Sequence, residues 1–599
     1  MAAKGPACEQ PRVNQAAPFS RRALLVAYVL ALIPAVATAL LQPMWSLIDE
    51  SDHYDLIAHY ANGEYPAEGS FITQQTLAID QATDIWGYGH SGSLPPPIHV
   101  RPFEAIPAGL TTTQRDLWIK NHIWEFSKEV SLPPLYYAAG VPVLAAGQAA
   151  GGPTASVYAL RLFNALLAAT VAPFSLLIAW AVWPGRRLVA FVAAAIGASL
   201  AGPLLGHTHV TSDVLGMVLG SAALLVAVRS ITTSDSSTRQ PIVIGFLFGL
   251  GILARLNVAL LWPALALAVL LTRERRRGVP AVGLLTASSV VTIAPWLVLN
   301  LVVFGAPTQL SRAFAWFPEP PPPADPGWWA ISTMTMAGGF FAGEPFGMVV
   351  GSFWIAAIGL FLTVFALAGL MRLSRDSASG ANRRVLAVLA VAVGTTVVGA
   401  AAYPAFAGTS LAAPGRYIFI VLPAATALLG AGLFTEFRRP VVVAGSASLL
   451  IAVSLAGLTT FLLAPTSVVR GPDARAVAAA TAISGAGTYG AFEVAALRCT
   501  RDRAGHEWLY IHAANSGSQP LDWLPVAETS SGTKAIKSDY ASSTELPRTL
   551  EAGKSVEGWL RLGPARLFAA AQPAVLIFRN VAEDGYQTIG DLELTISPC

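Results

Sequence analysis

Long apolar runs alternate with short basic segments over most of the chain. About eleven runs approach the roughly 20 residues that an α-helix needs to cross a bilayer core of about 30 Å. They predict membrane spans at 23–41, 159–183, 188–206, 213–229, 241–255, 256–271, 279–303, 346–371, 385–404, 417–435 and 441–463. The runs 241–255 and 256–271 are short, and they also fit one bent hairpin around Arg255 and Asn257. The pattern predicts an α-helical polytopic membrane protein.

The segment 133–150 is apolar enough to cross, but it contains several prolines and glycines. The arginine clusters between the later spans decide its placement, because cytoplasmic loops carry an excess of Lys and Arg. These clusters fall on the side of Arg21 and Arg22 only if 133–150 lies along the interface. The sequence therefore predicts a cytoplasmic N-terminus, an exported first loop at 42–158 and an extracytoplasmic C-terminus.

The first apolar run follows Arg21 and Arg22, as in a signal peptide. Its roughly 19 apolar residues exceed the apolar core of about 7–15 residues that signal peptides have. We therefore expect a retained span in a cell-membrane protein, preceded by a cytoplasmic tail at 1–22.

The pattern changes near the C-terminus. Short stretches that alternate or run apolar, such as 492–497, 507–512 and 556–562, are separated by Gly, Ser, Pro and Asp, which is typical of an antiparallel β-sandwich. We expect a transmembrane domain at 23–464, an Ala/Gly-rich linker at 465–486 and an exported β-sandwich domain at 487–599. Cys499 and Cys599 lie near the two ends of this domain, which suits one disulfide in an oxidising compartment.

Composition supports the membrane assignment and excludes several function classes. The chain has 599 residues, of which 54% are hydrophobic and only 12% are charged, and its mean hydropathy is +0.55. Soluble proteins carry about 25% charged residues. A net charge of +3 is too small to suggest nucleic acid as a partner. The sequence contains no CxxC zinc spacing, and no phosphate-binding Walker loop or nucleophile elbow in a suitable context.

Charged side chains cluster just beyond the first span. Asp49, Glu50, Asp52 and His53 follow one another closely in a chain that is poor in charge. If the segment is helical, Asp49, Asp52 and His53 share a face, because they are three or four residues apart. Such a group can deprotonate a hydroxyl or hold a divalent cation. Alternatively, the acids cap a helix and complement its dipole.

Five short motifs lie near the predicted outer ends of the spans. They are Asp49-Glu50-x-x-His53, Leu132-Pro133-Pro134-Leu135-Tyr136-Tyr137, Leu160-Arg161-Leu162-Phe163-Asn164, the glycine-rich run from Gly245 to Arg255, and Gly415-Arg416-Tyr417. In this order they resemble the GT-C superfamily of polytopic membrane glycosyltransferases over about residues 20–465. The last motif resembles a bacterial branch described as a domain of unknown function. Ser131 or Leu132 stands where many relatives have His, and Arg255 where many have Lys.

The resemblance implies a reaction on the outer face of the membrane. Such enzymes transfer a sugar from a polyprenyl phosphate or diphosphate to a hydroxyl acceptor, such as a cell-envelope glycan. An acid of the first loop acts as the base. Carried over here, Asp49 and Glu50 are the catalytic acids: Asp49 is the base, and Glu50, together with His53, positions the acceptor or a divalent cation such as Mg²⁺ or Mn²⁺. Some relatives work without metal, so both alternatives stay open.

The lipid donor carries phosphate, which arginine binds well through paired hydrogen bonds. Candidate phosphate ligands are Arg161, Arg255 and Arg416, and a charge deep in a span such as Arg255 is usually functional. The alternative for Arg255 is pairing with an acid. Asp213 resembles an outer-turn acid of the superfamily and follows a His-x-His pair at 207–209, where metal binding and helix capping are both open. Glu129 has no motif support.

Two other functions share this organisation. A transporter or flippase of lipid-linked sugars would also be polytopic with a buried arginine, but it does not need clustered acids on a large exported loop. A non-catalytic envelope assembly protein would keep the fold without the chemistry, which the presence of Asp49 and Glu50 disfavours.

Overall fold

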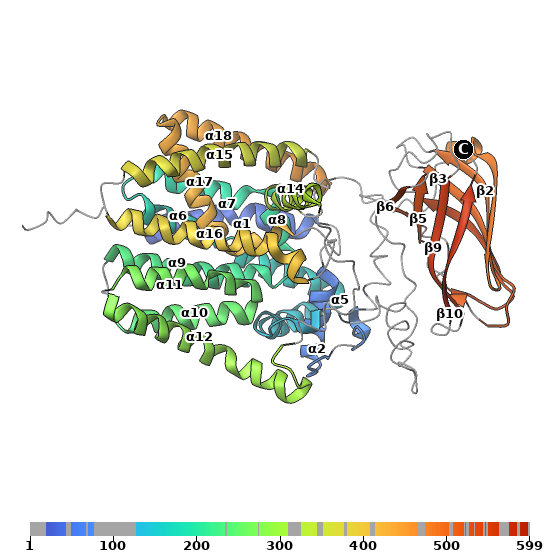
Figure 1. The fold of residues 1–599 in the computed structure, drawn as a ribbon, viewed down its shortest axis with the longest axis horizontal. Coiled ribbons are helices and arrows are strands. Elements are labelled where there is room, and N and C mark those ends of the chain that lie inside the picture. The colour runs from blue at the N-terminus through green and yellow to red at the C-terminus, as the bar shows by residue number, and fades with distance from the viewer. Residues whose placement is uncertain are drawn as a thin grey trace, which may run out of the picture.

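The computed structural model describes two parts, a helical bundle and a set of strands beyond one end of it (Figure 1). The described residues are mainly 19–42, 49–67, 70–76, 129–233, 237–273, 275–308, 325–343, 351–376, 380–407, 414–463, 474–501, 507–519, 526–531, 534–542, 549–561, 574–583 and 588–596, with a few isolated positions between them. The predicted fold class, a polytopic helical protein with a C-terminal β domain, is confirmed.

Within the described residues, the eleven predicted spans fall mainly on helical segments. Among these residues, eight helices are long and apolar enough to cross a membrane, or nine if the bent pair α7–α8 counts as one span, which is fewer than the eleven predicted. The bundle helices are α1 (Arg21–Leu41), α6 (Val171–Val182), α7 (Arg187–Ser199), α8 (Ala201–Thr208), α9 (Asp213–Thr233), α10 (Arg239–Ala254), α11 (Trp262–Leu271), α12 (Arg275–Phe304), α15 (Ser352–Asp376), α16 (Gly380–Ala407), α17 (Leu422–Phe437) and α18 (Pro440–Leu463). The chain is therefore a multi-pass membrane protein.

Arg255 lies at a turn and not deep inside a span, which corrects the expectation from the sequence. α10 ends at Ala254, Arg255 is extended (φ −154°, ψ 125°), and the 3₁₀-helix η3 (Leu256–Leu261) leads into α11. The bent-hairpin alternative at 241–271 therefore describes this region. Its turn places the Arg255 guanidinium at one end of the bundle, among the ends of several other helices.

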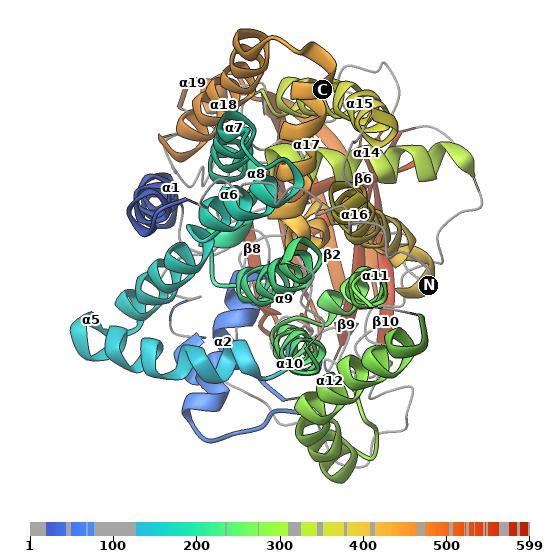
Figure 2. The same cartoon turned by 90° about the vertical axis from the view of Figure 1, so that its left-hand side faces the viewer.

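The segment predicted to lie along the interface forms the first arm of α5 (Leu135–Ala168). This helix is kinked at Gly151 and at Gly152, whose φ of 76° is the left-handed conformation that glycine adopts readily. A Cβ at Gly147 would collide with Ser156 of the second arm, so the two arms pack closely. In Figure 2 both arms are seen from the side, whereas α9 and α10 are seen along their axes. The first arm thus lies across the bundle end, while its placement at the membrane interface stays a prediction.

One helix lies in a segment that was predicted as loop. α14 (Pro326–Ala342) begins at Asp325, whose carboxylate accepts hydrogen bonds from the Gly327 and Trp328 N–H groups. It packs against α8 and the 3₁₀-helix η4 (Gly415–Val421). A Cβ at Gly415 would meet the backbone of Met336, so this contact requires glycine. With 17 residues, α14 is at the short end of the range of helix lengths that cross a bilayer.

The orientation of the bundle can be tested by thiol labelling. We expect Arg187→Cys and Ser236→Cys to be protected from a membrane-impermeant maleimide added to intact cells, because both positions follow spans that place them in the cytoplasm. Asn62→Cys, in the first loop, is the positive control, and all three are made in a Cys8→Ser background. Labelling of either predicted cytoplasmic site in unbroken cells would contradict the orientation.

The C-terminal strands are antiparallel wherever they pair. They are β1 (Thr481–Tyr489), β2 (Phe492–Arg501), β3 (Glu507–Asn515), β4 (Leu521–Asp522), β5 (Val526–Ser531), β6 (Lys534–Ser542), β7 (Thr549–Leu550), β8 (Ser555–Arg561), β9 (Ala574–Glu583) and β10 (Thr588–Ile596). Their order is β1-β2-β3-β8-β6-β5-β9-β4-β7, and β10 pairs with β9. β1 and β10 also contact each other, so the sheet closes on itself around a core that includes Phe492 and Ile511.

In the C-terminal part, the start of the first strand differs from the prediction, and the predicted disulfide involves a residue outside the described part of the chain. β1 begins at Thr481, inside the segment predicted as a linker, because its Ala/Gly-rich sequence still pairs with β2. Cys499 is fully buried in the core between the strands. Cys599 lies outside the described residues, so the Cys499–Cys599 disulfide stays a prediction.

Candidate functional site

Charged and polar side chains gather at the bundle end where α2 (Glu50–Ala61), α5 and the 3₁₀-helix η2 (Glu129–Ser131) lie, which we call the site end. The strands lie beyond this same end (Figure 1). The chain brings together acids and arginines that are far apart in the sequence: Asp49, Glu50, Asp52, Glu129, Arg161, Asp213, Arg255 and Arg416. Ionised groups are costly inside a membrane protein and are usually functional there.

Asp49 precedes α2 and has an unusual backbone. Its φ of 51° and ψ of 18° lie in the left-handed region, which few residues other than glycine enter, although Asn and Asp do so more readily than most. Its carbonyl accepts the first helical hydrogen bond, from the His53 N–H at 3.0 Å. Asp49 is therefore the N-terminal boundary residue of α2, and not part of a continuous helical face. Strain of this kind often accompanies a functional position.

The Asp49 carboxylate forms an ion pair with Arg416, which belongs to η4. Arg416 Nη2 lies 2.6 Å from Asp49 Oδ2, and the Asp49 side chain is 40% exposed whereas that of Arg416 is only 10% exposed. The close packing of Gly415 on α14 fixes the backbone next to Arg416. Of the three ion pairs in this cluster, this one presents a carboxylate that solvent and a substrate can reach.

Asp213 and Arg255 form a second ion pair, which is buried. Arg255 Nε lies 2.8 Å from Asp213 Oδ1, and Arg255 Nη1 donates a hydrogen bond to Ser212 Oγ at 3.2 Å. A Cβ at Gly216 would touch Arg255, so the glycine gives the arginine room. The alternative that Arg255 pairs with an acid is thus realised, and the acid is the outer-turn residue that the motif comparison singles out.

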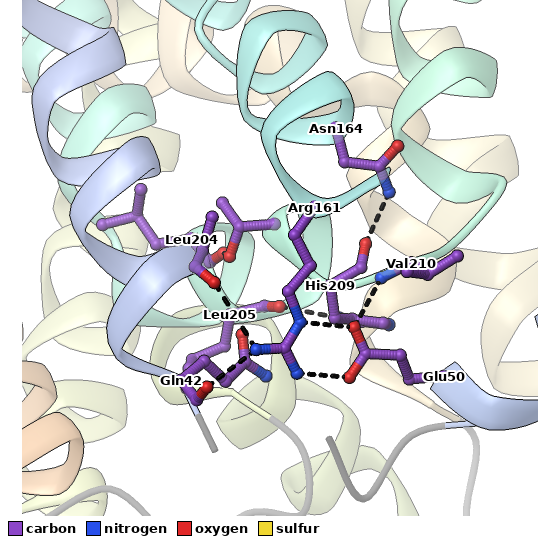
Figure 3. A network of polar contacts seen from close by, with 10 residues as sticks. Gln42, Glu50, Arg161, Asn164, Leu204, Leu205, His209 and Val210 are labelled. Carbon is purple, nitrogen blue, oxygen red and sulfur yellow. Dashed lines mark hydrogen bonds and ion pairs between the residues drawn. The ribbon is translucent and has the colours of Figure 1, made fainter. Parts of the chain in front are cut away.

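Glu50 and Arg161 form a third pair, and both side chains are fully buried (Figure 3). Arg161 donates from Nε to Glu50 Oε1 at 2.7 Å and from Nη2 to Oε2 at 2.6 Å. Glu50 Oε1 also accepts the Val210 N–H at 2.9 Å, and Arg161 Nη1 donates to the Gln42 carbonyl at 2.7 Å. The sequence assigned Glu50 to catalysis and Arg161 to phosphate. The geometry favours a structural role for both, because each is satisfied by the other and by the backbone.

The turn that precedes α9 is held by the same region of α5. Asn164 Nδ2 donates to the Thr211 carbonyl at 3.1 Å, and the Tyr136 hydroxyl donates to Asn164 Oδ1 at 3.0 Å. The Thr211 hydroxyl accepts the Asp213 N–H at 3.3 Å, which orders the turn just before α9. The ring of His207 packs edge-on against Phe419, with ring centres 5.0 Å apart. The hydrogen bonds of this turn therefore connect it to α5 and to its own backbone, and among the described residues its histidines belong to no group of three or more side chains arranged to hold a metal ion.

His53 lies between these pairs and is fully buried. Its Nδ1 shares a hydrogen bond of 2.8 Å with the Tyr137 hydroxyl, which in turn contacts Ser212. Burial, followed by the nearby positive charge of Arg255, holds the pKa of His53 well below its usual value of 6.5, so the ring is neutral. Within the described part of the chain, its Nε2 has no hydrogen-bond partner.

Asp49, Glu50 and His53 do not come together as a metal site. Among the described residues, no group of three or more His, Cys, Asp or Glu side chains is arranged to hold a metal ion. Glu50 points to Arg161 and Asp49 to Arg416, so the three side chains have different partners. A divalent cation stays a prediction of the family resemblance, without support from this set of ligands.

Glu129 is the residue that reasoning from motifs missed. It begins η2, just before the Pro-Pro segment, and is half-buried. Burial and the nearby negative charge of Asp49 raise the pKa of Glu129 to about 8. The sequence offers no signal that separates Glu129 from the other acids of the first exported loop, and nothing in it connects Glu129 with Asp49.

A histidine anchors the first loop to α2. His59 Nδ1 lies 2.5 Å from Glu64 Oε2, and its Nε2 lies 3.4 Å from Asp55 Oδ2 and 3.0 Å from the Phe71 carbonyl. Burial alone would lower the pKa of His59, but the two carboxylates outweigh it and raise this pKa to about 9. The charged ring ties α2 to 64–71, and so fixes the helix that carries the acids of the site.

Comparison with known proteins extends the resemblance read from the motifs. No protein-family model and no curated protein matches the chain. Similar solved structures include the Archaeoglobus fulgidus oligosaccharyltransferase in complex with zinc and sulfate, at 15% identity and a TM-score of 0.40, covering 76% of this chain and 54% of that chain. ArnT from Cupriavidus metallidurans bound to undecaprenyl phosphate has 14% identity and a TM-score of 0.43, covering 74% and 77%.

A third similar structure is the oligosaccharyltransferase AglB from Archaeoglobus fulgidus with an inhibitory peptide and a dolichol-phosphate, at 13% identity and a TM-score of 0.38, covering 76% and 57%. These neighbours are membrane glycosyltransferases of the GT-C type. The chain spans little more than half of the length of the archaeal chains, which are longer.

Proposed function

We propose that the protein is a GT-C-type membrane glycosyltransferase that moves a sugar from a polyprenyl-phosphate-type donor to a hydroxyl acceptor of the cell envelope. The observation that carries this proposal is Asp49, a strained and partly exposed carboxylate held 2.6 Å from Arg416 at the site end. A carboxylate that solvent can reach, beside fixed cations, combines the base and the phosphate ligands that this reaction needs.

Each residue of the site has a different role in the proposed sugar transfer. Asp49 accepts the proton of the acceptor hydroxyl while the acceptor oxygen bonds to the anomeric carbon of the sugar, and the bond from that carbon to the phosphate oxygen breaks. Arg416 and Arg255 stabilise the charge that develops on the leaving phosphate, since arginine donates to phosphate in a fixed planar geometry. Asp213 holds Arg255 in place through the 2.8 Å ion pair, and His53, neutral and buried, offers Nε2 to a polar ligand.

Glu50 and Arg161 have a supporting role in this proposal. Their buried pair links the start of α2 to α5 and, through the Val210 N–H, to the turn that carries Asp213. The pair therefore fixes Asp49 and Asp213 relative to each other. The acceptor class comes from the resemblance alone, and a cell-envelope glycan is the proposed acceptor.

A transfer assay with the purified protein in liposomes tests the function. Short-chain polyprenyl phosphates and diphosphates that carry different radiolabelled sugars are offered with envelope glycan fragments, and label that moves to the glycan is measured. We expect transfer from at least one donor. Donor that crosses the bilayer without transfer would instead support the transporter alternative, and neither activity would support the assembly-protein alternative.

A further inference from the structure

Glu129 lies where the charges of the site end converge. η2, which begins with Glu129, packs against α2 and leads directly into α5. The Glu129 carbonyl accepts the Leu132 N–H at 3.0 Å, which fixes the turn before the Pro-Pro segment. The charged groups that act on its carboxyl are Asp49 just before α2, Asp52 of α2, Arg255 at the α10–η3 turn and Arg416 of η4, and Glu129 in turn acts on Tyr137 of α5.

The two arginines that act on Glu129 already have anionic partners. Arg416 pairs with Asp49 at 2.6 Å and Arg255 pairs with Asp213 at 2.8 Å. Glu129 therefore adds a third carboxyl to two neutralised pairs, and in its half-buried position it interacts electrostatically with Asp49 and Asp52. Carboxyls in such surroundings do not all ionise together, because like charges close to each other repel.

Asp49 and Glu129 are in environments that favour different protonation states, with Asp49 ionised and Glu129 protonated. Burial and Asp49 raise the pKa of Glu129 to about 8, so Glu129 holds a proton at neutral pH. Asp49 forms an ion pair with Arg416, which requires its carboxylate to be ionised. Two neighbouring carboxyls that differ in this way commonly divide the acid and base roles of one reaction.

A second observation points to a ligand at the same place. His53 is fully buried among Asp49, Asp213, Arg255 and Arg416, and its Nε2 has no hydrogen-bond partner within the described part of the chain. Buried polar atoms of folded proteins are nearly always satisfied. A polar group that enters between these residues would satisfy His53 and would at the same time contact the cluster that Glu129 faces.

We propose that Glu129 is the general acid of the sugar transfer, donating a proton to the phosphate oxygen that leaves the sugar while Asp49 accepts the proton of the acceptor hydroxyl. This inference rests on the proposed glycosyltransferase function. The acceptor oxygen gains the anomeric carbon, the phosphate oxygen loses it, and one proton moves into Asp49 as another leaves Glu129. Asp49 then returns its proton to Glu129, so the net change moves the acceptor proton to the released phosphate.

The pH profile of transfer tests this role. In the wild type we expect turnover to fall as the pH rises through about 8, because Glu129 loses the proton it must donate. Glu129→Gln is expected to lower kcat by about 10²-fold, to leave the donor KM within a few-fold, and to abolish the alkaline limb. Glu129→Asp is expected to have a higher kcat than Glu129→Gln and to show an alkaline limb in its pH profile again. Glu551→Gln, an exposed glutamate of the strand region, is the matched control and keeps the wild-type profile.

Two measurements distinguish this inference from the proposed function. Infrared difference spectra between pH 6 and 9 report protonated carboxyls without any substrate, and we expect one such band to disappear through about pH 8 in the wild type and to be absent in Glu129→Gln. Absence of the band in the wild type overturns the inference. So does wild-type transfer with an unchanged profile in Glu129→Gln. Failure of every donor in the transfer assay overturns the proposed function, and the general-acid role with it.

The folding of the Glu129→Gln variant can be predicted from the same pKa. A carboxyl whose pKa is raised on folding, here from 4.5 to about 8, contributes stability that is fully present below 4.5 and is lost as the pH rises through about 8. Gln carries no such charge at alkaline pH. We therefore expect a thermal midpoint for Glu129→Gln at pH 9 that equals or exceeds that of the wild type, which separates lost chemistry from lost folding.

Discussion

Asp49→Asn is expected to lower the turnover of sugar transfer by about 10²–10⁴-fold while the protein remains folded and inserted. The acceptor hydroxyl is a poor nucleophile until a base takes its proton, and an amide cannot accept that proton at neutral pH. Asn is also one of the few residues that adopt the left-handed backbone readily, so the conformation of Asp49 (φ 51°) is preserved. Replacement by Ala would confound lost chemistry with backbone strain.

The response of the donor KM separates the two roles of Asp49. The carboxylate is both the proposed base and the partner of Arg416 at 2.6 Å. Loss of the base lowers kcat, whereas loss of the ion pair leaves the arginine with one fewer competitor for donor phosphate. We therefore expect a large fall in kcat with a donor KM that is unchanged or lower.

The measurement is the initial rate against donor concentration, at matched protein amount and with equal thermal midpoints for the two proteins. Asp52→Asn is the matched control, because it removes a neighbouring carboxylate of α2 that is buried and is not assigned as the base. Near-wild-type turnover in Asp49→Asn would show that another group is the base. A large effect in Asp52→Asn alone would transfer the role to Asp52.

The membrane part could be predicted well from the sequence, because a single physical requirement controls it. A helix that crosses lipid must be apolar over most of its length, so within the described residues the predicted spans fall mainly on helical segments. The arginine distribution predicts an interfacial placement for 133–150, which stays a prediction, and the prolines and glycines of this segment give no direct indication of tilt. α14 escaped prediction because a 17-residue apolar helix next to a proline-rich run has no signal of its own.

The candidate site could be predicted only in part. Short motifs identified Asp49, Arg255 and Arg416, but the pairing of Asp49 with Arg416 joins residues 367 positions apart. Such contacts depend on how the helices pack, which no local pattern records. The same limit explains the roles of Glu50 and Glu129. Adjacent acids look equivalent in the sequence, whereas the fold buries Glu50 against Arg161 and brings the unassigned Glu129 next to Asp49.

Glu50→Gln is expected to destabilise the protein by about 3–5 kcal/mol, because it leaves the guanidinium of Arg161 buried without an anion. Both side chains are fully buried, and the pair makes two short hydrogen bonds at 2.6 and 2.7 Å. Gln retains an acceptor for the Val210 N–H, so the loss comes mainly from the unpaired charge. Arg161→Met is expected to be similarly harmful, since it leaves the carboxylate of Glu50 without its partner.

The double variant Glu50→Gln/Arg161→Met provides the decisive comparison. It removes both charges, so we expect its stability to exceed that of either single variant, with a coupling energy of about 1–3 kcal/mol between the two positions. Thermal midpoints and the amount of inserted protein are measured for all four proteins, with exposed Glu493→Gln as the surface control. The family resemblance makes the opposite prediction, that Glu50 is catalytic. In that case Glu50→Gln would fold normally and lose turnover, and adding Arg161→Met would raise neither its stability nor its turnover. Rescue of stability by the second substitution can arise only if the two side chains act on each other, as the buried pair requires.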